Sequence, residues 1–391
     1  MSAVLLGAAR TPIGAFLGGL AALPAPKLGS IAIRCALERA HVTADNVDEV
    51  FMGNVVQAGV GQAPARQAAL GAGLPNTVPC TTVNKVCGSG LKAVMLAATQ
   101  IAAGEARLVV AGGMESMSNA PYLARGMRSG LSLGEHVLED ANLVDGLRDA
   151  YGHGHMGLGG EIVAEECGLS REDQDRFALA SYEKALRAQR EGAFAQEIVP
   201  VEVPGRKGAV TVVDRDETPR ETSLEALAKL QPAFKPGGTI TAGNASKLND
   251  GAAALVVASA ERATELGAKP LARIVAQAQF AHEPERFLAA PKGAIERCLE
   301  KAGWRVEDVD LFEVNEAFSG IECVRRELDL PEERFNVNGG AVALGHPIGA
   351  SGARLLVTLL YALAARSKTR GIASLCLGGG EAVALAIERL P

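Results

Sequence analysis

The two ends of this 391-residue chain resemble each other at one constant register, 262 positions apart. The helix-like segment around Ala32 matches the segment around Ala294, and Ser89 and Gly90 match Ser351 and Gly352. The full set of early matches pairs Ala32, Ile33, Leu37, Glu38, Arg39, Ala40, Val47 and Asp48 with Ala294, Ile295, Leu299, Glu300, Lys301, Ala302, Val309 and Asp310. A register held over some sixty positions predicts a duplicated α/β unit.

Each copy contains a predicted amphipathic helix followed by a predicted buried strand. After Gly88, apolar residues recur at Leu91, Val94, Met95 and Ala98, which is the spacing of one helical face. The sister helix begins at Ser351, and the β-rich runs 108–113 and 372–380 follow the two helices. Residues 119–249 are more polar and interrupt the first copy, and 253–259 returns to a strand that we expect to close it.

Composition excludes several classes of protein. The formal net charge of −6 provides no overall basic field for a nucleic-acid backbone. No run reaches the eighteen consecutive apolar residues typical of a membrane span, and Met1–Gly19 lacks the features of a leader, so we expect a cytoplasmic protein. The seven cysteines contain no CxxC pair, which argues against a disulfide framework and against a zinc site.

Cys87 is the first candidate for chemistry. It directly precedes the predicted helix that follows Gly88, where the helix dipole and unpaired N–H groups are expected to lower the thiol pKa. A thiolate there would serve as an acyl acceptor. The alternative is a buried cysteine at a tight turn.

His346 is the second candidate. Pro347 disfavours helical backbone angles at His346, and glycines on both sides leave room for the imidazole to face a cleft. Such an imidazole would suit a base that activates a thiol. The alternative is a turn histidine hydrogen-bonded to the backbone.

Two further residues follow predicted strands. Cys376 precedes three glycines whose N–H groups lie near a thiol, although ordinary burial in the strand is an alternative. Asn315 follows the predicted strand 311–314 and would orient a water or hold an oxyanion, or else cap a helix.

In this order and spacing the motifs resemble those of the thiolase family, and the resemblance covers essentially the whole chain. The segments that carry it are 84–94, His155-Met156-Gly157, 243–251, 315–318, 338–354 and 376–380. The resemblance implies an α/β fold of duplicated βαβαβαββ units in a five-layered α/β/α/β/α core. It implies an N-terminal half (1–118 plus 250–268), an inserted loop region for coenzyme A binding and oligomer contacts (119–249), and a C-terminal half (269–391).

The resemblance also assigns roles to the candidate residues. Cys87 is similar to the nucleophile that a CoA thioester acylates, and His346 to the base that takes its proton. Cys376 is similar to the acid/base that handles the α-proton of acetyl-CoA. Asn315, through a water, would form one oxyanion hole with His346, and the N–H groups of Cys87 and Gly378 would form the second.

Coenzyme A contacts are implied mainly for the inserted region. The matching positions are Ser246 on the pantetheine, His155 and Met156 at the thioester end, Phe234, Ala317 and Phe318 along the tunnel, and Arg220 for an adenine or phosphate contact. For Arg220, a solvated side chain is the simpler interpretation. The family implies no metal and no bound cofactor, with acetyl-CoA, 3-ketoacyl-CoA and CoA as substrates, and a homodimer or homotetramer.

Two segments depart from the family pattern. Glu381-Ala382 stands where Gln-Gly or Met-Gly is expected, and 158–163 replaces the usual Thr-Ala-Glu-Asn-Val. Both lie close to the expected acyl pocket, so chain-length preference is the least determined property.

The leading hypothesis is an acetyl-CoA C-acetyltransferase of the acetoacetyl-CoA type, with a longer-chain 3-ketoacyl-CoA thiolase as the alternative. Related condensing enzymes lack a second catalytic cysteine in a setting like that of Cys376. A non-enzymatic acyl-CoA-binding protein would be expected to lose Cys87 or His346.

Overall fold

The computed structural model describes residues 2–390. The first half contains β1 (Ala3–Arg10), β2 (Gly14–Ala15), α1 (Ala25–Ala40), β3 (Glu49–Gly53), α2 (Pro64–Ala72), β4 (Cys80–Val83), α3 (Ser89–Ala103), β5 (Leu108–Ser116), β10 (Asn249–Ser259) and α7 (Ala260–Glu265). The second half contains β11 (Ala272–Ala281), α8 (Ala290–Ala302), β12 (Leu311–Val314), α9 (Glu322–Glu327), α10 (Ala341–Leu344), α11 (Ser351–Ala365), β13 (Arg370–Leu377) and β14 (Glu381–Arg389).

The boundaries of the elements confirm the duplication. Helices α3 and α11 begin and end 262 residues apart, and strands β3 and β12, like β5 and β13, begin at the same separation. Strand β10 lies between β1 and β5, so the segment after the insertion closes the first copy as predicted.

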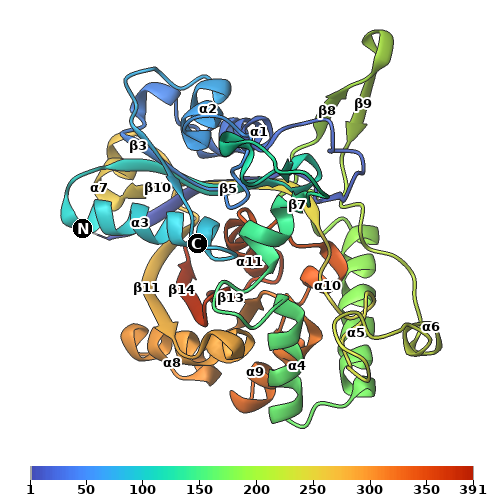
Figure 1. The fold of residues 1–391 in the computed structure, drawn as a ribbon. Helices are drawn as coiled ribbons and strands as arrows, with labels where there is room; N and C mark the ends of the chain where they lie inside the picture. Colours follow the sequence, from blue (N-terminus) through green and yellow to red (C-terminus); the bar gives the residue numbers. More distant parts are fainter. Residues whose placement is uncertain (1, 391) are drawn as a thin grey trace.

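The fold has the five predicted layers, and the strands of both halves are also hydrogen-bonded into one sheet. Figure 1 shows α1 and α2 on one outer face, α8 on the other, and α3 and α11 between the two halves of the sheet. The strand order is β4-β3-β5-β10-β1 in the first half and β11-β14-β13-β12 in the second. The halves join where Val4 and Leu5 of β1 pair with Arg273 and Ala272 of β11.

Glycines allow the two central helices to meet at their N-terminal ends. A Cβ on Gly352 would lie 2.5 Å from the backbone nitrogen of Leu91, and one on Gly90 would lie 2.8 Å from that of Ala353. No larger residue fits this contact without moving a backbone. The segment Val86–Ala103 is apolar and long enough to cross a membrane, but α3 lies in the central layer and packs against α11 and the sheet, which accounts for its apolarity.

The inserted region is more ordered than a loop region. It contains β6 (Tyr122–Leu123), β7 (Glu139–Asp140), α4 (Met156–Glu166), α5 (Arg171–Arg190), β8 (Val201–Pro204), β9 (Val210–Val213) and α6 (Leu224–Ala228). Helices α4 and α5 lie beside the second half, and the β8–β9 hairpin projects from the molecule (Figure 1). A capping box on Ser170 and Asp173 starts α5.

One disulfide corrects the expectation from cysteine spacing. Cys167, just after α4, is bonded to Cys323 of α9, with the Cα atoms 5.9 Å apart. The bond joins the insertion to the second half across 156 residues of sequence. Spacing could not predict it because the two cysteines meet only through tertiary packing.

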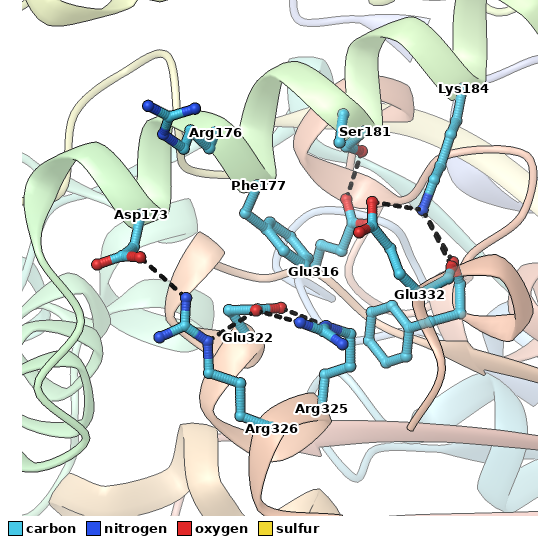
Figure 2. A pocket seen from close by; sticks show the side chains of 12 residues that line it. Asp173, Arg176, Phe177, Ser181, Lys184, Glu316, Glu322, Arg325, Arg326 and Glu332 are labelled. Atoms are coloured by element: carbon cyan, nitrogen blue, oxygen red, sulfur yellow. Dashed lines mark hydrogen bonds and ion pairs between the residues drawn. The ribbon is translucent and has the colours of Figure 1, made fainter. Parts of the chain in front are cut away.

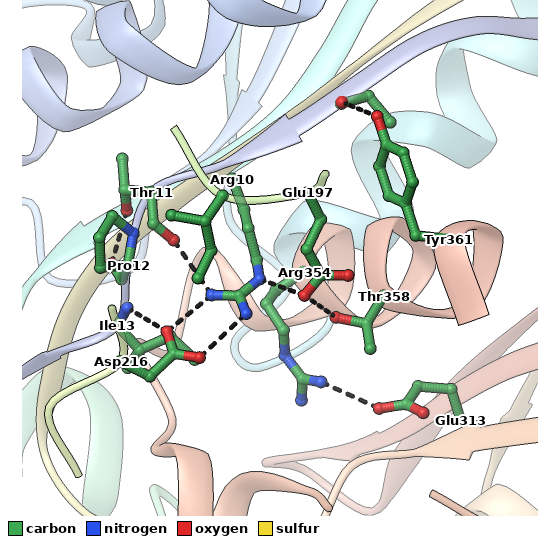
Figure 3. Close-up of polar contacts among 12 residues, drawn as sticks. Arg10, Thr11, Pro12, Ile13, Glu197, Asp216, Glu313, Arg354, Thr358 and Tyr361 are labelled. Carbon is green, nitrogen blue, oxygen red and sulfur yellow. Dashed lines mark hydrogen bonds and ion pairs between the residues drawn. The ribbon is translucent and has the colours of Figure 1, made fainter. Parts of the chain in front are cut away.

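A buried ion network also fastens the insertion to both halves (Figure 3). Arg10 at the end of β1 donates to both carboxylate oxygens of Asp216, at 2.7 and 2.9 Å, and to Glu197 at 2.6 Å. Thr358 of α11 donates to the same Glu197 oxygen at 3.1 Å. Loss of one partner would leave a buried charge unpaired, which typically costs about 3–5 kcal/mol.

Candidate active site

Cys87 lies in a strained turn between β4 and α3. The preceding residue, Val86, has a φ of +46°, which is unfavourable for a β-branched side chain. The turn is held by the N–H of Lys85, which donates to the Ser89 hydroxyl at 2.8 Å, and by the N–H of Gly88, which donates to the carbonyl of Lys85 at 3.0 Å. The turn therefore fixes the Cys87 sulfur at the start of the central layer.

The Cys87 thiol is buried, and this corrects the expectation of a low pKa. Burial raises the pKa of the Cys87 thiol to about 12, although the backbone N–H groups of Gly378 and of Cys87 itself bond to the sulfur and oppose the rise. The cysteine is therefore a neutral thiol in the free protein at pH 7, and it needs a base. The two N–H groups are the pair to which the family resemblance assigns the second oxyanion hole.

His346 presents a free nitrogen. Its Nδ1 lies 2.6 Å from the hydroxyl of Ser351, and that hydroxyl donates to the carbonyl of Pro347 at 2.9 Å. This network assigns the ring hydrogen to Nδ1. The buried Nε2 atom has no hydrogen-bond partner among the described residues, so it keeps its lone pair for a proton.

The surroundings of His346 keep it neutral. Burial, and then the charge of Arg354, lower the pKa of His346 to about 3. Arg354 is itself paired with the buried Glu313 at 3.0 Å. A neutral imidazole with an unpartnered Nε2 can accept a proton from a thiol.

Asn315 and Cys376 are brought together by strand pairing. Strands β12 and β13 are parallel with Val314 opposite Ser374, and the N–H of Asn315 donates to the carbonyl of Ser374 at 3.0 Å. Cys376 is fully buried near Cys87; burial and then the charge of Cys87 raise the pKa of its thiol well above the usual range. The Asn315 amide has neither its oxygen nor its nitrogen hydrogen-bonded among residues 2–390, so the helix-cap alternative is wrong.

Replacement of Asn315 by alanine should lower the turnover number by about 10²–10³-fold, the loss typical of one oxyanion-hole contributor. The folded protein should keep its stability or gain some, because a buried amide without partners costs free energy. Steady-state kinetics and thermal unfolding of the variant would measure both. A large fall in stability with an unchanged turnover number would show that Asn315 has a structural role and no role in catalysis.

Glu115 is a residue that sequence reasoning missed. Its buried carboxylate accepts the N–H groups of Val55 at 3.0 Å and Gly349 at 2.9 Å, and the amide of Asn54 at 2.6 Å. It thereby fixes the segment that carries His346 to the end of β3, while burial raises the pKa of Glu115 to about 7. The available signal was a charged residue inside the buried run of β5.

Apart from Arg220, the predicted coenzyme A residues form one cluster. His155 and Phe234 stack with ring centres 4.5 Å apart, and Phe318 meets Phe234 edge-on at 5.8 Å. The N–H of Ser246 donates to the carbonyl of Ala317 at 3.0 Å. Met156, which begins α4, lies 3.8 Å from the position of a Cβ on Gly378, so the cluster reaches the turn beside Cys87.

Arg220 lies apart from the aromatic cluster. It is exposed, and its guanidinium carbon is 5.9 Å from the ring centre of Tyr182 on α5. Tyr182 contacts Lys247, the residue after Ser246. Arg220 is thus near the loop of Ser246, and its role in binding stays a prediction.

The two departures from the family pattern have structural partners. Glu381 forms an ion pair with Lys85 at 2.5 Å, which links the hairpin after Cys376 to the turn before Cys87. Gly160 allows Phe318 to pack closely, since a Cβ there would lie 3.2 Å from the phenyl ring. The Gly160 change lies against the cluster, whereas the Glu381 ion pair lies at the turn before Cys87.

A separate charged cavity of about 150 Å³ lies between α5 and α9 (Figure 2). Arg326 donates to Asp173 and Glu322, each at 2.9 Å, and Arg325 donates to Glu322 at 2.6 Å. The cavity contains neither candidate thiol nor His346, and its arginines are already paired. It is therefore a surface ion cluster next to the site.

The fold and this site define a class of protein. Residues 3–261 match the family model for the thiolase N-terminal domain, and residues 268–389 match that for the thiolase C-terminal domain. The chain belongs to the thiolase family.

Individual relatives are similar over the whole length. An acetyl-CoA acetyltransferase of Cupriavidus necator is 52% identical over 388 residues, which are 99% of this chain and 99% of that one. A probable acetyl-CoA acyltransferase of Staphylococcus aureus is 50% identical over 100% of both chains. A solved acetyl-CoA acetyltransferase from Syntrophomonas wolfei has a TM-score of 0.97 and 42% identity, covering 100% of this chain and 99% of that one.

Proposed function

We propose that the protein is an acetyl-CoA C-acetyltransferase that interconverts two acetyl-CoA with acetoacetyl-CoA and CoA. The observations that carry the proposal are two buried thiols that lie near each other, Cys87 and Cys376, and buried polar side-chain atoms that lack partners. His346 Nε2 and both amide atoms of Asn315 lack partners among residues 2–390, and such buried groups are normally satisfied. A substrate oxygen and a water would supply the missing partners.

In the first half-reaction, His346 Nε2 takes the Cys87 proton as the sulfur attacks the thioester carbonyl of acetyl-CoA. The negative charge then forms on the carbonyl oxygen, which the N–H groups of Cys87 and Gly378 would bind. Collapse breaks the carbon–sulfur bond to CoA, which leaves as a thiol after receiving the proton from His346. The product is acetyl-Cys87.

In the second half-reaction, Cys376, which has given its own proton to the Cys87 sulfur released in the preceding turnover, removes the α-proton of a second acetyl-CoA. The resulting enolate oxygen is stabilised by His346 and by a water on Asn315, and the carbon attacks acetyl-Cys87. The bond from the acetyl carbon to the Cys87 sulfur breaks, that sulfur takes the proton from Cys376, and acetoacetyl-CoA is released. Because the steps are separate, the kinetics should be ping-pong.

The aromatic cluster of His155, Phe234 and Phe318 supports a CoA thioester as substrate, with its acyl end at Met156. The similarity to acetyl-CoA acetyltransferases supports the acetyl class. We also propose a homodimer or homotetramer that uses the inserted region. Exposed apolar side chains there, including Tyr122, Leu133 and Val137, support this assembly, which light scattering would measure.

A thiolysis assay tests the proposed function. Purified protein with CoA and acetoacetyl-CoA should lose the 3-ketoacyl absorbance, and 3-ketoacyl-CoA of increasing chain length should react more slowly. Equal or faster cleavage of long chains would replace the proposal with the longer-chain thiolase. Absence of cleavage at every length would reject both.

A further inference from the structure

Lys247 is a half-buried lysine at the junction of three segments. It lies between Ser246 and the start of β10, and its ammonium group donates to the hydroxyl of Tyr182 on α5 and to the carbonyl of Val342 on α10. It forms no salt bridge within residues 2–390. The ammonium also lies 4.9 Å from the ring centre of Tyr182, where the aromatic face attracts a cation.

The carbonyl of Val342 needs this partner. Helix α10 has only four residues, and Gly345 ends it, so the N–H of His346 does not continue the helix. That N–H donates instead to the side chain of Asn249 at 2.9 Å. In a longer helix, the N–H of residue 346 would donate to the Val342 carbonyl. Because that N–H is bonded to Asn249, the Val342 carbonyl is free to accept from Lys247.

Lys247 and Asn249 thus hold the segment of His346 at two points, both from one short stretch of chain. The same stretch begins at Ser246, whose N–H is bonded to Ala317 beside the aromatic cluster. On the other side, the N–H of Val342 donates to the buried Glu316 at 3.2 Å. The backbone of Val342 is therefore held on both sides: its carbonyl accepts from the Lys247 ammonium, and its N–H donates to the Glu316 carboxylate.

A partly buried ammonium without a carboxylate contact loses hydration, and this costs free energy unless other groups bond to it. Burial, and then the charge of Arg220, lower the pKa of Lys247 to about 7, while Glu316 acts in the opposite direction. An apolar residue at position 247 would avoid the desolvation cost of the ammonium. The hydrogen bonds of Lys247 to Tyr182 and Val342 therefore indicate a role in addition to packing.

We propose that Lys247 is a positioning residue that locks the Ser246 loop to α5 and to the segment of His346, and so sets the affinity for the CoA portion of the substrate. The inference rests on the proposed function, because it takes Ser246 to face coenzyme A. Lys247 touches neither thiol; it acts through the backbone of its own loop and of Val342.

The test compares Lys247→Met, which removes the charge and keeps most of the side-chain length, with Lys269→Met, an exposed lysine before β11. We expect Lys247→Met to raise the KM for CoA in thiolysis by about tenfold or more with a smaller change in kcat. Calorimetric titration with CoA should show the same loss of affinity. Lys269→Met should match the wild type.

Chemical rescue separates positioning from a general loss of structure. In Lys247→Ala, added ammonium can occupy the space between the Tyr182 hydroxyl and the Val342 carbonyl. Ammonium chloride should recover several-fold of the lost kcat/KM, whereas sodium chloride at equal ionic strength should not. If Lys247→Met does not fold, Lys247→Ala prepared in ammonium provides the same comparison.

An unchanged KM and CoA affinity in Lys247→Met would overturn the inference while leaving the thiolase function intact. So would a variant that loses stability and kcat together without rescue by ammonium. If the wild type binds CoA in a Lys247-dependent way and yet cleaves no 3-ketoacyl-CoA, the proposed function fails separately.

Discussion

Replacement of Cys87 by serine should lower acetyl transfer by about 10⁴-fold or more. A serine hydroxyl is a weaker nucleophile, and at this position it would have to be deprotonated by a histidine whose pKa is about 3. The thiol itself has a pKa of about 12, so even cysteine depends on transferring its proton during attack. Serine removes the polarisable sulfur that makes this step feasible.

Mass spectrometry would locate the acyl group. Wild-type protein incubated with acetyl-CoA should carry one acetyl group on the peptide containing Cys87, and Cys87→Ser should carry none. Cys80→Ser, on the strand that leads to the same turn, is the matched control and should acetylate normally. An adduct on a different cysteine, or full turnover by the serine variant, would remove Cys87 from its role.

Replacement of Cys376 by alanine should abolish carbon–carbon bond formation and cleavage but preserve acyl exchange. Acylation of Cys87 needs only His346 and the backbone donors, whereas the second half-reaction also needs a base for the α-proton. Loss of a general acid/base typically costs about 10²–10⁴-fold. We therefore expect the rates of acetoacetyl-CoA synthesis and thiolysis to fall by this factor. The rate of label exchange between acetyl-CoA and free CoA should change much less.

Cys298→Ala provides the control for packing. Cys298 is also a fully buried thiol in the same apolar cluster, on α8, so its removal creates a similar small cavity away from the site. Both variants should lose comparable stability, and only Cys376→Ala should lose synthesis. If Cys376→Ala loses exchange and synthesis equally with its fold intact, the division of labour between the two thiols is wrong.

The sequence determined the duplicated α/β architecture and the identity of the candidate groups. A repeat at constant register and helical periodicity are local properties of the chain, so α3 and α11 and the strands after them could be predicted. The glycine-flanked settings of Cys87, His346 and Cys376 are likewise visible in sequence.

The tertiary structure alone decided the electrostatics of the site and its cross-links. Residue order predicted a low pKa for Cys87 from the helix N-terminus, but burial raises it and outweighs the backbone N–H groups that bond to the sulfur. The His346 tautomer, the disulfide between Cys167 and Cys323 and the contacts of Lys247 all join residues far apart in sequence or depend on desolvation. Desolvation and long-range contacts exist only once the layers have packed, so no local pattern of residues can encode them on its own.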